Sequence, residues 1–533
     1  MMSLRKTRSI EIPLTMDSFE TADSFIEEWM KQNHISNKSI LETKLMFEAQ
    51  FHNLIAQGFD HNTILTIKAQ KTFGEYNIKL GFEGKAYIPG NNEMDGISPE
   101  MSVVNAYNDK VGYRYRLGYN SIRIVVKRNY RSSLLYCAAG LVLAILVFLL
   151  LQANMSTESQ LELNDKYILP LMNQFANAML MVGAPVTFFS LIKNLTDIYI
   201  LSEKSSSGRE LQIKTILTSV ISIMLALGIG LLVGFLLDSR RGYLSGMESF
   251  TGGMSVSQFL SSLIPSSIFE PFETYMPFPI IIVALLITYA LCSISEYFDT
   301  IQKMINVCFS LFSKMLNVII FALPFFCFLA FLKALLSKGF INLLVILEFV
   351  VLVTVSLVVV FLFYVIRLMI GGVKIGWFFK RLPPLIWENF KINSAIEAVP
   401  FNIRYCSRNY KFDRKRLSAK LPILAQTNQD GNCYLITLIS MIFIFLLGIE
   451  VSLLQVVGIA VLILFLSVGA PNQPGSVMVG ILIISFYLGA NDLVSIAIFA
   501  EVFFGALQNA INVIGDIVTV AIEEQKIQKI ITA

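Results

Sequence analysis

The sequence predicts a polytopic α-helical membrane protein with a soluble α+β domain at its N-terminus. Hydrophobic residues make up 55% of the 533 residues and charged residues only 15%, whereas soluble domains contain roughly 25% charged residues. The charges are unevenly distributed, because residues 1–131 are rich in Lys, Glu, Asp and Asn while long apolar runs follow Leu134. We therefore expect a soluble domain over residues 1–131 and a transmembrane domain over residues 132–533.

The apolar runs are long enough to cross a membrane, since a hydrocarbon core of about 30 Å needs about 20 apolar residues per helix. Leu134–Leu151 carries no charge, and Val350–Tyr364 lacks the polar face that a helix of a large soluble core would show. Hydropathy predicts spans near residues 134–152, 167–192, 212–237, 277–297, 304–336 and 341–370. The Gly-containing segment 238–276 between two of them is typical of an extracytoplasmic loop.

The charges that flank the first span predict its orientation. Four basic residues precede it and three acidic residues follow it, namely Arg123, Lys127, Arg128 and Arg131, then Glu158, Glu162 and Asp165. The positive-inside rule then places the N-terminus in the cytoplasm. The first apolar run begins after about 130 residues, so we expect an uncleaved signal-anchor and a multi-pass protein of the cell (inner) membrane.

The residues that usually build metal centres or enzyme sites are sparse. The six cysteines are scattered without a close CxxC pair, and the three histidines all fall in the soluble part. This pattern predicts neither disulfides nor zinc. No nucleophile–base pair is apparent, so we expect a protein that is not an enzyme and has no cofactor apart from a coupling ion.

The pattern changes beyond residue 372, where short apolar pieces are interrupted by polar, Gly or Pro stretches at 391–400, 426–432, 469–476 and 508–516. Broken backbone at membrane depth persists only where protein or a water-filled cavity satisfies it, and in transporters such breaks hold substrate and ions. We interpret 426–432 and 469–476 as re-entrant or unwound segments. The alternative is that 391–432 is one long cytoplasmic loop, a description that suits the basic stretch Arg404–Lys420.

Two polar clusters lie within these broken segments. Gln426–Asn432 is the first, and the second runs from Gln508 to Asp516, where Asn509, Asn512 and Asp516 share one helical face. No Lys or Arg lies between Lys420 and Lys526, so Asp430, Glu501 and Asp516 have no cation nearby in sequence. A buried carboxylate needs a partner, and we expect bound Na⁺ or H⁺. Hydrogen bonding between helices is the alternative; it explains the amides but leaves the carboxylates unexplained.

These clusters resemble motifs of the dicarboxylate/amino acid:cation symporter family, which has the glutamate-transporter fold. Asn428-Gln429-Asp430-Gly431-Asn432 is similar to its N-M-D-G-T motif, and Asn512-Val513-Ile514-Gly515-Asp516 is similar to its eighth-span pattern. Four further segments follow in matching order, at 184–188, 264–269, 393–395 and 469–475. The resemblance covers about residues 133–530 and implies eight transmembrane helices, two re-entrant hairpins, a homotrimer and an elevator-type mechanism.

The resemblance also implies a set of site residues. The implied cation ligands are Asn428, Asp430, Asn512, Asp516 and Ser222, with Asp430 and Asp516 as Na⁺ ligands. The implied substrate contacts are Ser394, Asn432, Pro471, Asn472, Gly475, Gln508, Asn509 and Asn512. Family members that carry acidic amino acids have an Asp and an Arg where this chain has Gly505 and Gln508. We therefore expect symport of a small organic solute, an amino acid or a carboxylate, other than a typical acidic amino acid.

The soluble domain shows helix-like and strand-like patterns, with an amphipathic helix over Lys44–Gln57 and strands over Ile64–Ala69, Tyr76–Phe82 and Ile122–Lys127. An α+β sandwich is expected. It weakly resembles the anti-sigma-factor kinase branch of the histidine-kinase-like ATPases, at Asn53, Gly58, Gly84 and Gly118-Tyr119-Asn120. Ala49 and Phe82 replace the family's Glu and Asp, which favours a degenerate, regulatory domain with a cytoplasmic partner. An unrelated α+β module and an active kinase are the alternatives.

Two functions from different classes follow. The ordered motifs favour a cation-coupled symporter that binds a small solute and no nucleic acid. The altered residues Gly505 and Gln508 keep a second hypothesis open, in which a transporter-like body senses a solute and the N-terminal domain reports it.

Overall fold

The computed structural model describes residues 7–56, 63–72, 75–85, 111–116, 118–128, 133–204, 206–236, 264–273, 275–294, 297–338, 340–449, 451–469, 475–487 and 494–532. The chain divides into two compact units, Met1–Arg131 and Ser132–Ala533. Each unit has its own hydrophobic core, and each is described by itself below.

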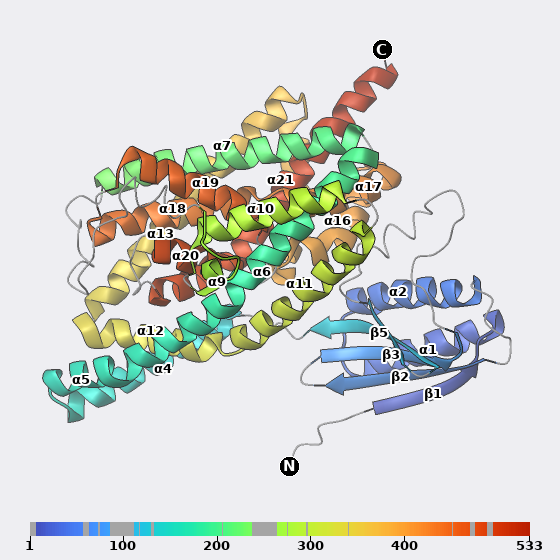
Figure 1. The fold of residues 1–533 in the computed structure, drawn as a ribbon, viewed down its shortest axis with the longest axis horizontal. Helices are drawn as coiled ribbons and strands as arrows, with labels where there is room; N and C mark the ends of the chain where they lie inside the picture. The colour runs from blue at the N-terminus through green and yellow to red at the C-terminus, as the bar shows by residue number, and fades with distance from the viewer. Residues whose placement is uncertain are drawn as a thin grey trace. The chain divides into compact units, whose positions relative to one another are not determined.

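The N-terminal unit contains a five-stranded antiparallel sheet with the order β1-β2-β3-β5-β4. Its strands are β1 (Thr7–Pro13), β2 (Ile64–Thr72), β3 (Glu75–Glu83), β4 (Val111–Arg116) and β5 (Tyr119–Arg128). The helical segments are η1 (Met16–Ser18), α1 (Phe19–Gln32) and α2 (Asn37–Ala56), and both α-helices lie against the sheet (Figure 1).

Alternation along the strands explains why this sheet forms. Successive strand residues point to opposite faces, and every second residue is buried in three strands, as in Leu65, Ile67 and Ala69 of β2. These residues form one core with Trp29 of α1 and with Phe47 and Phe51 of α2. The sequence predictions for α2, β2, β3 and β5 thus match elements of the structure.

The second unit is built from helices throughout the residues that the structure describes (Figure 1). Its first half contains α4 (Ser133–Asn154), α5 (Thr157–Leu163), η2 (Asn164–Ile168), α6 (Leu169–Lys204), α7 (Ser206–Leu236), α9 (Glu270–Glu273), α10 (Pro277–Ser293), α11 (Phe298–Ile320), α12 (Leu323–Lys338) and α13 (Phe340–Ile370). The second half contains α14 (Ile375–Phe379), α15 (Leu382–Ile392), α16 (Ala395–Asn409), α17 (Arg414–Thr427), α18 (Asp430–Leu447), α19 (Leu453–Gly469), α20 (Ser476–Tyr487) and α21 (Val494–Thr532).

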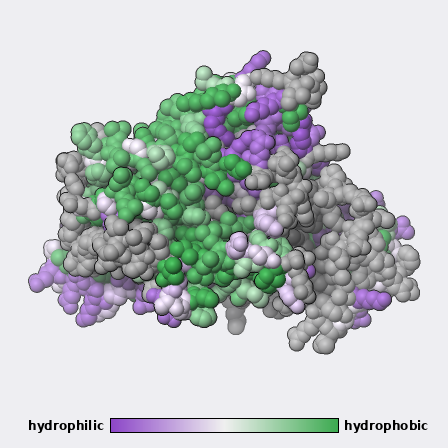
Figure 2. Space-filling model, turned by 45° about the horizontal axis from the view of Figure 1, so that its top comes forward, coloured by the Kyte–Doolittle hydropathy of each residue, from purple (hydrophilic) through white to green (hydrophobic). Residues whose placement is uncertain are grey.

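The apolar surface of this unit suits a membrane. Six helical stretches of the described residues are long and apolar enough to cross one, namely Thr157–Asp197, Glu210–Phe235, Thr300–Ile320, Leu344–Ile370, Arg416–Leu447 and Val494–Ile527. Figure 2 shows hydrophobic residues covering the middle of the helical unit, with hydrophilic residues toward opposite ends. Exposed apolar side chains such as Val355 and Val358 of α13 contribute to the apolar surface of the unit.

The single span expected over residues 304–336 is wrong, because the structure has two helices there. α11 ends at Ile320 and α12 begins at Leu323. Pro324 explains the break: it has no N–H with which to continue the helix and is favoured in a first helical turn. The loop expected over 238–276 falls largely outside the described residues, although α9 lies within it.

Three of the four broken segments are interrupted as predicted. α15 and α16 meet at Asn393-Ser394, α17 and α18 are separated by Asn428-Gln429, and α19 ends before α20 begins at Ser476. The stretch 508–516 lies instead inside the continuous helix α21. The alternative of one long loop over 391–432 is wrong, because α16 and α17 occupy most of that range.

Candidate functional site

The polar cluster is centred where the start of α18 packs on α21. Asn428 precedes α18 in extended conformation and Asp430 is its first residue, while Asn512 and Asp516 lie one turn apart on α21. All four side chains are at most 2% exposed. The structure therefore brings together four of the five predicted cation ligands, from segments more than 80 residues apart.

Hydrogen bonds connect these residues directly. Asn428 Nδ2 donates to Asp516 Oδ1 at 2.9 Å and to the Asn512 carbonyl oxygen at 3.0 Å. The Gly431 N–H donates to Asn512 Oδ1 at 2.7 Å. Asn428 Oδ1 makes no hydrogen bond within the described residues. Carboxylate, amide and carbonyl oxygens thus converge in a setting sealed from solvent, and such oxygens hold Na⁺ in broken transporter helices.

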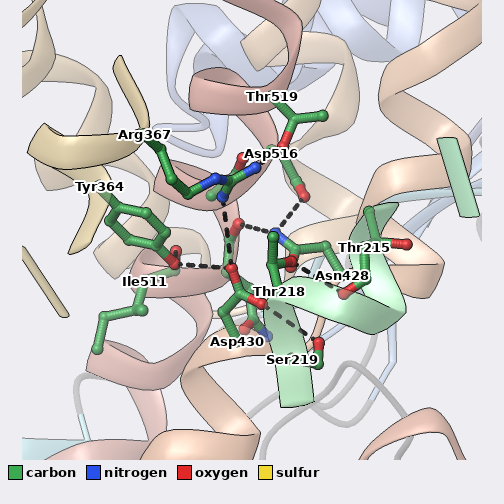
Figure 3. A network of polar contacts seen from close by, with 12 residues as sticks. Thr215, Thr218, Ser219, Tyr364, Arg367, Asn428, Asp430, Ile511, Asp516 and Thr519 are labelled. Atoms are coloured by element: carbon green, nitrogen blue, oxygen red, sulfur yellow. Dashed lines mark hydrogen bonds and ion pairs between the residues drawn. The ribbon is translucent and has the colours of Figure 1, made fainter. Parts of the chain in front are cut away.

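Asp430 has a second set of partners on two other helices (Figure 3). Ser219 of α7 donates to its Oδ1 at 3.2 Å, and Thr218 lies beside it. The Tyr364 hydroxyl of α13 is 3.2 Å from Oδ2 and equally far from the Ile511 carbonyl oxygen. Four helices, α7, α13, α18 and α21, therefore surround the Asp430 carboxylate.

Arg367 of α13 corrects the expectation that no basic side chain neutralises these carboxylates. Its Nη1 lies 3.9 Å from Asp430 Oδ2, and its Nη2 donates to Thr519 Oγ1 of α21 at 2.9 Å. The prediction considered only the sequence between Lys420 and Lys526, whereas this guanidinium comes from a helix that precedes both. Asp430 thus has a cationic partner within the chain.

Ser222 makes no hydrogen bond to the residues of this cluster. Its hydroxyl is fully buried and makes no hydrogen bond within the described residues. Ser219, one turn earlier on α7, is the serine of this helix whose hydroxyl donates to Asp430. The role of Ser222 as a cation ligand stays a prediction.

Glycines allow the helices to approach this closely. A Cβ atom on Gly515 would lie 2.5 Å from Asn428 Nδ2 and 2.9 Å from both Asp430 Oδ2 and the Tyr364 hydroxyl. A Cβ on Gly431 would collide with the Gln508 carbonyl oxygen and lie 3.0 Å from Asn512 Oδ1. Any larger residue at these positions would push apart the groups that form the cluster.

Glu501 binds the N-terminal end of α20. Its carboxylate is buried and accepts the N–H groups of Gly475 at 2.7 Å and Met478 at 3.2 Å. These orphan amides of a first helical turn are suited to a carboxylate. The Glu501 carboxylate thus has hydrogen-bond partners within the chain, and a bound cation at Glu501 stays a prediction. A Cβ on Gly505 would lie 2.5 Å from Glu501 Oε1, so Glu501 occupies the space beside Gly505.

The turn between α15 and α16 also contacts α21. Asn509 Nδ2 donates to Asn393 Oδ1 at 2.8 Å, and Asn393 adopts a left-handed conformation with φ of 51°. Asn389 and Asn402 exchange amide hydrogen bonds between the two helices, at 2.8 and 3.2 Å. The Ser394 hydroxyl accepts the Glu397 N–H as the cap of α16, so this predicted substrate residue has a structural role.

The other predicted substrate residues differ in how they are satisfied. Gly475 has a φ of +97° and donates its N–H to Glu501. Gln508 accepts from the Ser476 hydroxyl at 3.1 Å, and Asn432 donates to Gln429 at 2.8 Å. Three buried atoms make no hydrogen bond within the described residues: Gln508 Nε2, Asn509 Oδ1 and Asn432 Oδ1. Pro471 and Asn472 lie outside the described residues.

In the N-terminal unit, the residues at the positions of the nucleotide-binding motifs have structural contacts. Phe82, which replaces the adenine-reading Asp, is only 1% exposed and belongs to the core. Asn120 donates to the Lys85 carbonyl oxygen at 2.9 Å, and the Gly84 N–H donates to Gly118. These contacts join β5 to the turn after β3, while Gly58 lies outside the described residues.

Sequence reasoning missed Arg367, Tyr364, Ser219 and Thr519 as members of the cluster. A signal was present for Arg367, because it is a charged residue within the apolar helix α13. Its position near the end of that helix is also typical of a residue at the membrane surface. The sequence alone therefore does not distinguish a residue of the ion cluster from a residue at the membrane surface.

One comparison with known proteins bears on these contacts. A model of the family described as "Sodium:dicarboxylate symporter family" matches residues 134–525, which include every residue named above in the contacts of Asp430 and Asp516. The predicted resemblance of the membrane region is confirmed, and with it the multi-pass membrane character. On the match over most of its length, the chain belongs to the sodium:dicarboxylate symporter family.

Proposed function

We propose that this protein is a secondary active transporter that couples sodium entry to the symport of a small organic solute, an amino acid or a carboxylate. The observation that carries the proposal is the meeting of Asn428 and Asp430 with Asn512 and Asp516. A carboxylate in a membrane protein marks an ion pathway when it faces the protein interior. Both carboxylates do so here, with at most 2% exposure.

The Asn428 amide supports a sodium site beside Asp516. Its Nδ2 now lies between Asp516 Oδ1 and the Asn512 carbonyl oxygen. Rotation of the amide by half a turn would exchange Nδ2 for the unbonded Oδ1. Asn428 Oδ1 would then take the place of Nδ2 beside Asp516 Oδ1 and the Asn512 carbonyl oxygen. A monovalent cation would hold these three oxygens together.

Coupling to the solute would follow from the shared helix α21. We take α15–α16 as the first hairpin and α19–α20 as the second. α21 contacts the start of α20 through Glu501 and Gln508, and the turn between α15 and α16 through Asn509. A cation that tightens α18 against α21 would favour the state in which both hairpin tips are seated. An ion and a solute that each prefer this state stabilise one another's binding. In the elevator mechanism the hairpins and their helices would move as one body within a homotrimer.

The proposed solute class is supported by neutral polar groups of α18 and α21. The unbonded Gln508 Nε2, Asn509 Oδ1 and Asn432 Oδ1 offer one donor and two acceptors without charge. Glu501 is occupied by the hairpin amides and fills the space beside Gly505. We therefore propose a polar solute that carries fewer charges than an acidic amino acid.

The remaining assignments extend this proposal. The charge pattern around the first span supports a cytoplasmic N-terminus and a location in the cell (inner) membrane. The N-terminal unit would then be a regulatory domain with a cytoplasmic partner. The burial of Phe82 supports a degenerate rather than an active nucleotide site.

The test replaces Asp516 by Ala in the full chain and measures sodium-dependent thermal stabilisation in detergent, with choline as the comparison ion. We expect the wild type to be stabilised and Asp516→Ala to show no response. Glu162→Ala is the control, because that carboxylate is exposed. An unchanged sodium response in Asp516→Ala would contradict the proposal.

Sealed vesicles distinguish the transporter from a sensor. Vesicles that contain the protein should accumulate a labelled solute, chosen from amino acids and monocarboxylates, when an inward sodium gradient is imposed. Binding without accumulation would favour the sensor, and accumulation driven by a proton gradient alone would assign the coupling to H⁺.

A further inference from the structure

We propose that Arg367 is a resident cation: its guanidinium takes the place of one mobile coupling ion at Asp430, and a single sodium ion binds at Asp516. The inference rests on the proposed function and adds the number of ions that the site takes. It begins from the ion pair between α13 and α18.

The guanidinium is held in position from several sides. Nη2 donates to Thr519 Oγ1 at 2.9 Å, while the ring faces of Phe363 and Tyr364 lie 5.5 and 5.9 Å from the guanidinium carbon. Arginine is well suited to such stacked, hydrogen-bonded positions. The Arg367 side chain is 15% exposed, and its partner Asp430 is fully buried. A cation that is fixed in this way cannot leave when the transport cycle turns.

Counting charges shows what the guanidinium changes. Asp430 and Asp516 together carry two negative charges, and Arg367 supplies one positive charge. One negative charge is therefore left for the solution to neutralise. A second monovalent ion would give the cluster an excess positive charge in surroundings of low dielectric constant, where unpaired charge is strongly disfavoured.

The remaining charge belongs to Asp516. The hydrogen bond that its carboxylate makes comes from the neutral Asn428 amide. The Asn512 carbonyl oxygen accepts from the same Nδ2, and Asn428 Oδ1 is unbonded within the described residues. An incoming ion thus finds oxygen atoms at Asp516, while the side of Asp430 that faces α13 is already opposite a guanidinium.

Arg367 of α13 contacts α21 too far from Gln508 to replace the arginine that is missing at that position. Its partner Thr519 lies 11 residues beyond Gln508, which corresponds to about 16 Å of helix. Gln508 contacts Ser476 at the second hairpin. The guanidinium therefore acts on the ion cluster and not on a solute held between the hairpin tips.

The experiment counts bound sodium in the full chain by equilibrium binding of ²²Na⁺ in detergent. We expect about one ion per chain in the wild type, and about two in Arg367→Met, because the lost guanidinium frees Asp430 for a second ion. The double variant Arg367→Met/Asp430→Asn restores the net charge of the cluster and should return to about one. Arg367→Lys keeps the charge and should also bind about one.

The double variant guards against a single variant that fails to fold, since a buried ion pair can be replaced by neutral residues. The inference is overturned if Arg367→Met binds the same number of ions as the wild type. It is equally overturned if the double variant or Arg367→Lys binds none. An absence of sodium binding in the wild type would remove the proposed function itself, so the two failures are distinguishable.

Discussion

Asp430 and Asp516 lie in one polar cluster but differ in their neighbours. Asp430 faces a guanidinium, a serine hydroxyl and a tyrosine hydroxyl, whereas the hydrogen bond to Asp516 comes from the neutral Asn428 amide. The chain therefore supplies a cationic side chain to one carboxylate, and we propose that an ion from solution neutralises the other. In the proposal above, Asp430 is not the ligand of a mobile ion, because a cationic side chain from another helix lies opposite it.

The largest expected effect comes from Asp430→Asn. The substitution leaves the Arg367 guanidinium, whose side chain is 15% exposed, without its counter-ion. Breaking one side of a fully buried ion pair costs about 3–5 kcal/mol, and access of solvent to the guanidinium places the expected loss toward the lower end of that range. Thermal unfolding of the full chain without sodium should show a marked loss of stability. The matched variant Asp516→Asn should not lower sodium-free stability, because it removes a buried charge that makes no ion pair within the described residues. Equal destabilisation by both variants would contradict the asymmetry.

Gly515→Ala tests whether the surroundings of Asp430 and of Asp516 both depend on the close packing of α21 against its neighbours. The added methyl group would meet Asn428, Asp430 and Tyr364 together, and overpacking of this kind costs about 1–3 kcal/mol. We expect sodium affinity to fall by more than about tenfold, a loss of at least about 1.4 kcal/mol. Gly228→Ala on α7 is the control, because a Cβ there meets no atom within 4 Å. Wild-type sodium affinity in Gly515→Ala would contradict this expectation, because it would mean that α21 can move away from Asn428 and Asp430 without weakening the site.

Glu501→Gln extends the comparison to a carboxylate that is satisfied by backbone amides. Glutamine can still accept one N–H, but it loses the charge-assisted part of the two hydrogen bonds, worth about 1–2 kcal/mol. Hydrogen exchange should become faster in the first turn of α20 while sodium binding at Asp516 is retained. Loss of sodium binding in this variant would mean that Glu501 belongs to the ion site. Ser476→Ala supplies the control, since it removes a neutral contact with Gln508 from the same turn.

The smallest effect is expected for an ion pair in water. Lys44 contacts Asp23 at 2.8 Å and Glu27 at 2.5 Å on the N-terminal unit. Hydrogen bonds from Lys31 and Lys44 lower the pKa of Glu27 to about 2, and the hydrogen bond to Asp23 raises the pKa of Lys44. Because the folded-state pKa of Glu27 is depressed, its stabilisation is present above the unfolded pKa, near 4.5, and is lost as the pH falls toward about 2.

We therefore expect Lys44→Met to reduce the difference in α1–α2 stability between pH 6 and pH 3, as measured by hydrogen exchange of the full chain. The change should be small, since these side chains are 20–31% exposed and ion pairs that solvent reaches contribute little. A loss as large as that of Asp430→Asn would show that solvent exposure does not separate the two kinds of pair.

Many helices and strands and four residues of the site could be predicted from the sequence, because they depend on local patterns or on ordered motifs. Alternation along β2 and the interruption at Asn428-Gln429 are both visible in short stretches of sequence. The pairing of Asp430 with Asp516 was expected through the resemblance to a family. The break between α11 and α12 had a local signal in Pro324, which the hydropathy pattern obscured.

The partner of Asp430 could not be predicted in this way. Arg367 lies 63 residues before Asp430 in the chain, and only the packing of α13 beside α18 and α21 brings it near. Ser219 and Ser222 lie one turn apart on one face of α7, so which hydroxyl reaches Asp430 depends on how far α7 is displaced along its axis relative to α18. Contacts between distant helices depend on such details, which no local pattern contains.

The ion pair of Arg367 has a consequence for the energy available to transport. A sodium ion that crosses a membrane potential of about 100 mV releases about 2.3 kcal/mol, and each 1.4 kcal/mol or so corresponds to a tenfold concentration ratio. A charge attached to the polypeptide returns with it and releases nothing. Each mobile ion that a guanidinium replaces therefore lowers the attainable accumulation of solute by about 50-fold from the electrical part alone. Such a transporter would work against a shallow solute gradient and consume little sodium for each molecule it carries.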